Sequence, residues 1–401
     1  MPIATSATRR ITKLVPKRLR ELEALVHTGA LRSAVALFAR NGGALPDWDD
    51  RPRRALFIRY DRLGDMVLCT GVLRAIAAAH PALVIDVLTT PANAPALEAL
   101  PFVRGVILHE RRRRRELPSL IRRLRSAGYD AVIDGLIGRP SVNSYTTLLM
   151  LATRAPWRIG SAGRPHDFVY NVPVPPPATC YAEHHVDHLA RLARPFGLGA
   201  GDADWRPTLV LAEDERDVAD GAWCQTAGDG ARVLVNLSSG DPCRRWPDDR
   251  FDVVLDALRQ RLPDAQIIVT ALAAERPSAE SAAGHVGGRA MTPTVRELFA
   301  LIAESDFVIT PDTAVTHIAS AFARPTLALM RRRKEFAMWV PYHTSGVNAF
   351  GRTTESLEGL SATAVVAALE RYLESPAAEP VLRAERQHAT SAAQHGPTHR
   401  F

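Results

Sequence analysis

Residues 55–89 read ALFIRYDRLGDMVLCTGVLRAIAAAHPALVIDVLT, and this stretch decides the fold class. The apolar runs over 55–59 and 83–89 have the length and composition of buried strands. Residues 67–79, which lie between them, carry apolar side chains at helical spacing. A strand, a helix and a second strand in this order predict a parallel sheet covered by helices on both faces.

The same alternation continues along the chain and is interrupted at the proline-rich stretch 172–178 and again at 202–207. We therefore expect an α/β protein with two doubly wound domains that face a central cleft, with ligands at the carboxyl ends of the strands. The expected strands are 55–59, 83–89, 105–109, 131–134 and 158–161 in the first half and 233–237, 266–270, 307–310 and 326–329 in the second, with helices over 67–79, 117–127, 250–262 and 294–304.

These patterns divide the chain into four parts. Residues 1–50 form a basic N-terminal helical extension and a polar linker, and 51–205 form the first α/β domain. The second α/β domain covers 206–374. From 375 to 401 the chain becomes rich in Ala, Pro, His and Gln without periodicity, which predicts a disordered tail.

Positive charge is concentrated at the N-terminus. The 401 residues carry a net charge of +7, and residues 1–46, with eight basic and two acidic side chains, account for +6 of it. The near-neutral remainder does not fit a nucleic-acid-binding body. Residues 9–40 predict a basic helix, which either lies on an anionic membrane surface or packs on the domain behind it. The run Arg111–Arg115 predicts a solvated loop that could add to such a surface.

Cysteine and histidine usage gives no metal motif. The four cysteines show no CxxC spacing, which argues against a zinc site and a disulfide framework and fits a reducing compartment. His184, His185 and His188 lack the pattern of an HExxH site, so we expect an exposed helix there and no metal. No apolar run reaches the roughly 18–20 residues of a membrane span, and the N-terminus resembles no secretory signal. These features predict a cytoplasmic protein.

The turn after the first strand carries two carboxylates, Asp61 and Asp65, with Gly64 between them. Asp65 stands where a helix N-cap is expected, and it also stands at the carboxyl end of a strand facing the predicted cleft. It is therefore either a helix cap or a general base. Asp61 and Gly64 belong to the same rim of the predicted site.

Two loops of the second half suit an anionic ligand. Arg244 and Arg245 follow a strand and a turn of small residues, and they either bind a diphosphate or remain solvated. Asp312 or Thr313 caps a later helix whose free amides would bind phosphate, and His317 lies one turn inside it. Neither GxxxxGK[ST] nor a well-placed GxGxxG occurs, which disfavours a P-loop NTPase and a nicotinamide-dependent oxidoreductase.

Taken in order, these segments resemble glycosyltransferase family 9, the family of the ADP-heptose:lipopolysaccharide heptosyltransferases. The resemblance covers about residues 53–345. Residues 244–251 are similar to the family's K-x-W-P-x-x-x-F segment, and 312–319 to its D-(T/S)-G-x-x-H-x-A signature. The other segments that carry it are 55–68 with Asp61-Arg62-Leu63-Gly64-Asp65, 73–75, Ala274-Glu275-Arg276 and the helix 294–301.

The resemblance implies a GT-B fold and an inverting, metal-independent sugar transfer from a nucleotide-diphosphate donor, without a cofactor. The first domain is then the acceptor side and the second the nucleotide-sugar side. By motif position Asp65 is the implied base. The implied donor-binding residues are Arg244 and, with it, Glu275 at the ribose or base, Asp312 at a sugar hydroxyl, and Thr313 and His317 at the diphosphate.

The chain departs from the family pattern around the donor pocket. Arg244 replaces a lysine, Ala314 replaces the signature glycine, and Met330-Arg331-Arg332 replaces Phe-Gly-Pro. ADP-L-glycero-D-manno-heptose is the leading candidate donor, and the expected acceptor is the core of lipopolysaccharide or a related glycolipid at the cytoplasmic face of the membrane. The departures, Ala314 above all, also motivate an alternative, a non-catalytic nucleotide-sugar-binding or membrane-associated module.

Overall fold

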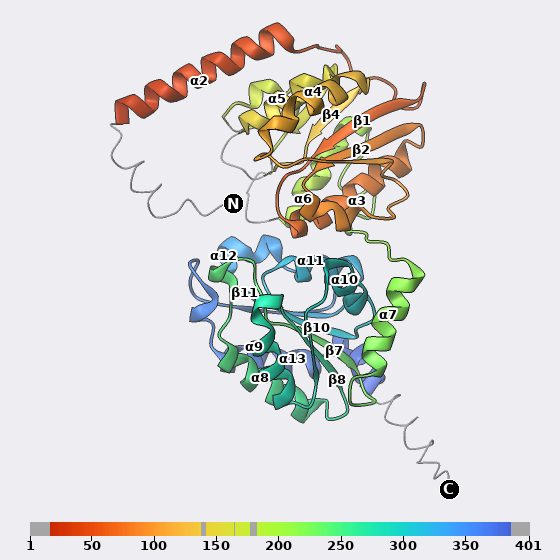
Figure 1. Ribbon diagram of the computed structural model, residues 1–401, viewed down its shortest axis with the longest axis vertical. Helices are drawn as coiled ribbons and strands as arrows, with labels where there is room; N and C mark the ends of the chain where they lie inside the picture. Colours follow the sequence, from red (N-terminus) through yellow and green to blue (C-terminus); the bar gives the residue numbers. More distant parts are fainter. Residues whose placement is uncertain (1–16, 138–141, 164, 177–182, 386–401) are drawn as a thin grey trace.

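The computed structural model describes residues 17–137, 142–163, 165–176 and 183–385 (Figure 1). The first domain contains a six-stranded parallel sheet in the order β3-β2-β1-β4-β5-β6. Its strands are β1 (Arg53–Ile58), β2 (Leu83–Thr89), β3 (Gly105–Leu108), β4 (Ala131–Asp134), β5 (Trp157–Ser161) and β6 (Val172–Val174), and its α-helices are α3 (Leu63–Ala79), α4 (Leu117–Ser126), α5 (Ser144–Thr153) and α6 (His185–Ala190).

The second domain repeats this plan with the order β12-β11-β10-β7-β8-β9, again all parallel. Its strands are β7 (Arg232–Asn236), β8 (Gln266–Thr270), β9 (Arg289–Met291), β10 (Phe307–Pro311), β11 (Thr326–Met330) and β12 (Gly346–Phe350). Its α-helices are α7 (Glu213–Cys224), α8 (Asp248–Arg261), α9 (Arg276–His285), α10 (Val295–Ala303), α11 (Ala314–Ala321), the short α12 (Arg333–Phe336) and α13 (Ala362–Leu373). The predicted pair of doubly wound α/β domains is confirmed.

Three strands that the sequence did not predict, β6, β9 and β12, lie at sheet edges. An edge strand is buried on fewer sides and does not need a continuous apolar run. Pro173, inside the stretch predicted to be a break, is tolerated in β6 because an edge strand has backbone amides that need no partner.

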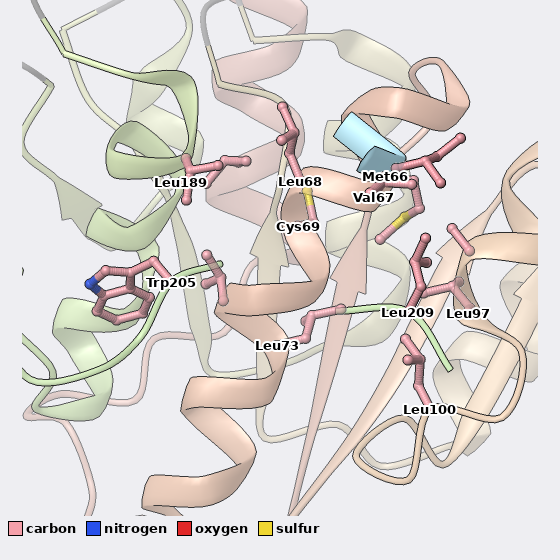
Figure 2. Close-up of a cluster of buried hydrophobic side chains, with 14 of the residues drawn as sticks. Met66, Val67, Leu68, Cys69, Leu73, Leu97, Leu100, Leu189, Trp205 and Leu209 are labelled. Atoms are coloured by element: carbon pink, nitrogen blue, oxygen red, sulfur yellow. The ribbon is translucent and has the colours of Figure 1, made fainter. Parts of the chain in front are cut away.

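Helix α3 is buried over almost its whole circumference, as expected for a helix that is apolar on all sides. It packs against α6 within its own domain and against α11 of the second domain. Figure 2 shows its side chains Leu68 and Leu73 among Leu189, Trp205 and Leu209. The same buried cluster includes Phe299, Val315 and Ile318 of the second domain, so the two domains share an apolar core rather than a solvated boundary.

The predicted N-terminal helix 9–40 is observed as α2 (Lys17–Phe38) over the residues that the structure describes, and residues 1–16 lie outside the described part. The prediction of a polar linker after it needs correction. The segment expected to be a polar linker contributes Trp48, which is buried against Trp157 and Phe196.

The prediction of a disordered tail from residue 375 is wrong for 375–385. These residues form a 3-10 turn (Pro376–Ala378) and a further helical segment that buries Val381. The Glu385 carboxylate accepts hydrogen bonds from the Ala231 and Asp264 amides at 2.7 and 2.8 Å. The apolar and hydrogen-bonding contacts of this segment are made with residues far away in the sequence, so its local composition did not reveal them. Residues 386–401 lie outside the described part.

Candidate active site

A cavity of about 850 Å³ lies between the two domains at the carboxyl ends of their strands. Its lining includes residues of α3, α6 and α11. Figure 1 shows α3 and α6 of the first domain facing α11 of the second. The structure brings together seven of the eight predicted site residues in its lining: Asp61, Gly64, Asp65, Arg244, Asp312, Thr313 and His317.

Asp61 and Asp65, the two carboxylates of the first domain that line the cavity, both pair with Arg59, a buried residue that the sequence did not single out. Its Nη2 atom lies 3.3 Å from Asp61 Oδ2 and 3.2 Å from Asp65 Oδ1. Its Nη1 donates to the Gly135 carbonyl. Arg59 therefore holds both carboxylates in position through one guanidinium group.

The two alternatives for Asp65 are now separated. The helix α3 begins at Leu63 rather than near Met66, its N-cap residue is Arg62, and that cap makes no side-chain hydrogen bond. Asp65 is the third residue of the helix, and its side chain is 20% exposed. It does not cap α3, so its carboxylate remains available to the cavity, where the amide end of the helix favours its negative charge.

Gly64 of α3 packs directly against α11 of the second domain. A Cβ atom added at Gly64 would lie 2.8 Å from His317 Cδ2 and 3.1 Å from the Ala314 Cα atom. Real Cβ atoms almost never come that close, so any side chain here would push α3 away from α11. Ala314, the departure from the family glycine, therefore lies opposite Gly64 and lines the cavity.

The second domain contributes Arg244 and the amide end of α11 to the cavity lining. Thr313, not Asp312, is the N-cap of α11, and its hydroxyl accepts from the Val315 amide at 3.2 Å. Arg244 Nη1 donates to the Asp312 carbonyl at 3.0 Å and lies 3.4 Å from Asp312 Oδ1. The guanidinium group and the amide end of α11 together form a site suited to a diphosphate.

Glu275, the eighth predicted site residue, does not line the cavity, and neither does Arg245 of the loop after β7. Glu275 accepts a short hydrogen bond from the Ser238 hydroxyl and one of 2.6 Å from Arg245 Nη1. Arg245 is also paired with Asp248 at 3.3 Å. The loop after β7 thus contributes one arginine to the cavity rather than two, and the role of Glu275 at the ribose or base stays a prediction.

The prediction of an exposed helix at His184–His188 is wrong, because α6 is packed between α3 and the segment that follows α12. His184 Nε2 lies 2.8 Å from the Val340 carbonyl of the second domain. His185 and His188 are buried, and both line the cavity. Within the described ranges, no group of three or more His, Cys, Asp or Glu side chains is arranged to hold a metal ion.

His317 is buried at the junction of the domains, and burial lowers its pKa to about 3, with His184 and Arg244 acting in the same direction. It is therefore neutral near pH 7. A neutral imidazole supplies one hydrogen-bond donor and one acceptor rather than a charge.

A further ion pair connects the two domains across the cleft. Arg62 of the first domain lies 3.2 Å from Asp241 Oδ2 in the loop after β7. Both residues line the cavity. The pair joins residues 179 positions apart, and nothing in the local sequence around either one indicated it.

Two doubly wound domains, each with a parallel six-stranded sheet, face one cleft at the carboxyl ends of their strands, which is the architecture of the GT-B class. The family model for glycosyltransferase family 9 (heptosyltransferase) matches residues 117–358, and the chain belongs to this family. The predicted family resemblance and GT-B fold are confirmed. Because the matched range begins after Asp65, the family model does not test the role of that residue, which stays a prediction.

Solved structures with the same fold have low sequence identity to this chain. A family 9 glycosyltransferase from Veillonella parvula has a TM-score of 0.68 and 18% identity, covering 82% of this chain and 99% of its own. ADP-heptose lps heptosyltransferase II from E. coli has a TM-score of 0.63 and 20% identity, and the match covers 80% of this chain and 98% of that one. E. coli heptosyltransferase WaaC with ADP has a TM-score of 0.61 and 18% identity, and the match covers 82% of this chain and 99% of that one. Among curated proteins, none matches the chain.

Proposed function

We propose that this glycosyltransferase moves a sugar, with inversion and without a metal ion, from a nucleotide-diphosphate donor to a lipopolysaccharide core or related glycolipid. The leading donor is ADP-heptose. One observation carries the proposal: Asp65 of the first domain and Arg244 with the start of α11 of the second domain line the same cavity. A direct displacement needs a base on one side of the anomeric carbon and charge stabilisation on the other.

In the proposed reaction, Asp65 takes the proton of an acceptor hydroxyl while that oxygen attacks the anomeric carbon. The bond from this carbon to the diphosphate oxygen breaks on the opposite face, and its electron pair leaves with the diphosphate. Arg244 and the amides at the start of α11 stabilise the departing charge. Asp312 accepts a hydrogen bond from a hydroxyl of the transferred sugar, and the N–H of neutral His317 donates one to the diphosphate.

The identity of the donor is supported by relatives rather than by contacts in this chain. The E. coli heptosyltransferase WaaC, which shares the fold, has been solved with ADP, and a second E. coli neighbour is named for ADP-heptose. We therefore expect ADP to stabilise the protein more than GDP or UDP.

A thermal-shift series with ADP, GDP and UDP tests this expectation. Nucleotide that binds only the folded state stabilises it by about 2.7 kcal/mol at 100 times its dissociation constant, so the melting temperature rises most for the correct base. A larger shift with GDP or UDP would contradict ADP-heptose as donor. Transfer is then measured with the matching nucleotide sugars and a glycolipid acceptor. Binding without transfer to any acceptor would favour the non-catalytic alternative.

We also propose that α2 holds the enzyme at an anionic membrane surface, on the cytoplasmic side where the lipid-linked acceptor is expected. One part of α2 packs on the first domain, where the Arg32 guanidinium lies 4.5 Å from the Phe168 ring centroid. Val26, Leu37 and Phe38 remain exposed. These apolar side chains lie within residues 1–46, which carry a net charge of +6, and this combination suits an anionic bilayer, where each basic residue contributes about 1 kcal/mol. No helix in the described ranges is both long and apolar enough to cross a membrane.

Sedimentation with phosphatidylglycerol-containing vesicles at low salt tests the role of α2. Replacing Val26, Leu37 and Phe38 by glutamate is expected to leave most of the protein in the supernatant. The matched control replaces Val218, Val253 and Leu272, three exposed apolar residues of the second domain, in the same way. Equal sedimentation of the α2 variant and the wild type would mean that α2 only packs on its own domain.

A further inference from the structure

The Asp312 carboxylate is buried between two guanidinium groups, one on each oxygen. Its side chain is 4% exposed, with Oδ1 3.4 Å from Arg244 Nη1 and Oδ2 3.6 Å from Arg331 Nη2. A buried carboxylate needs compensating charge to remain ionised. Arg244 is the family's phosphate-binding position, whereas Arg331 lies in the segment that departs from the family pattern.

Arg331 is fixed in place by its surroundings. It directly follows β11, which pairs with β10 so that the Asp312 amide donates to the Leu329 carbonyl at 2.9 Å. Its guanidinium lies 3.9 Å from the Phe336 ring centroid, and its Nη1 donates to the Thr354 carbonyl at 3.2 Å. These contacts leave its Nη2 directed at Asp312.

Arg244 is placed differently. It ends a one-turn 3-10 helix (Pro242–Arg244), its side chain is 25% exposed against 12% for Arg331, and it lines the cavity, which Arg331 does not. It is also 4.0 Å from the Asp241 carboxylate. Arg244 can therefore turn toward a ligand, but doing so takes charge away from Asp312.

We propose that Arg331 is a positioning residue, the permanent counter-ion of Asp312, which keeps that carboxylate charged and oriented when Arg244 engages the donor diphosphate. This inference rests on the proposed function for the identity of the ligand. It assigns the two arginines separate tasks: Arg244 binds the ligand, and Arg331 holds the residue beside it.

The charges around Asp312 give the sign of the effect. Burial raises the pKa of Asp312, and Arg244, Arg331 and the more distant Arg62 oppose that rise. Asp241, near both Arg244 and Arg331, adds negative charge, and His317 is neutral. Without Arg331, the departure of Arg244 toward a diphosphate would leave Asp312 uncompensated, and it would take up a proton. Nucleotide binding would then consume a proton and weaken as the pH rises.

Calorimetry of ADP binding in buffers of different ionisation enthalpy tests this proposal. We expect no proton uptake at Asp312 in the wild type and uptake of up to one proton in Arg331→Met, with affinity falling about tenfold for each pH unit above neutrality. Arg331→Lys retains the charge and should behave as the wild type. Arg332→Met, which removes an exposed arginine paired with Glu335, is the matched control.

The double variant Asp312→Asn/Arg331→Met keeps the test decisive if Arg331→Met folds poorly, because it also removes the buried carboxylate. Its ADP affinity should equal that of Asp312→Asn alone. A further loss would mean that Arg331 contacts ADP directly and would overturn the proposal, as would wild-type affinity and proton stoichiometry in Arg331→Met. Failure of the wild type to transfer sugar would count against the proposed function and leave this binding test intact.

Discussion

Replacing Asp65 by asparagine is expected to lower the rate of sugar transfer by about 10³-fold, within the range that a positioned general base supplies. The amide has the shape of the carboxylate but cannot accept the acceptor's proton. Arg59 would retain Asp61 at 3.3 Å, so its buried charge stays paired and the variant should fold. Transfer is measured from the released nucleoside diphosphate. Donor binding is measured from the thermal shift with ADP, and this shift should be the same in the variant and the wild type.

The control for this variant is Asp256→Asn, which changes an exposed carboxylate of α8 and should leave transfer unchanged. Asp61→Asn distinguishes the two carboxylates that share Arg59. Full turnover by Asp65→Asn together with loss of turnover by Asp61→Asn would show that Asp61 is the base and that our assignment is wrong.

Replacing Arg244 by alanine is expected to lower transfer by about 10²- to 10³-fold, the effect of removing one donor that stabilises developing charge. The affinity for ADP should fall as well, because Arg244 is the arginine of the β7 loop that lines the cavity. Arg331, 3.6 Å from Asp312, still compensates that carboxylate, so the loss should appear in binding and rate more than in stability.

Arg244→Lys should recover part of the lost activity, because lysine keeps the charge but not the two-pronged geometry of the guanidinium. Arg261→Ala removes an exposed arginine paired with Glu374 at 3.3 Å and is the matched control. If ADP bound Arg244→Ala as tightly as the wild type, the diphosphate site would have to be placed elsewhere.

The strands that sequence patterns located well are the central ones. The runs over 83–89, 131–134 and 266–270 coincide with β2, β4 and β8, because strands covered on both faces are predominantly apolar. The edge strands β6, β9 and β12 lack such runs and were not predicted. The burial of α6 was not predicted for a different reason. Its histidines are covered by a segment of the second domain, and the local sequence carries no sign of that contact.

The two α/β domains and the family could be predicted from the residue pattern alone, and Asp65, Arg244 and Asp312 could be proposed for the site, because each follows a strand in a motif readable from neighbouring residues. Only the tertiary structure revealed that Arg59 holds Asp61 and Asp65, that Gly64 lies against Ala314, and that Arg331 compensates Asp312. Periodicity reports how a segment is buried, whereas these contacts depend on how strand ends and domains meet. Their free energies come from pairing buried charges and excluding a side chain at one point of the cleft, and neither leaves a local pattern.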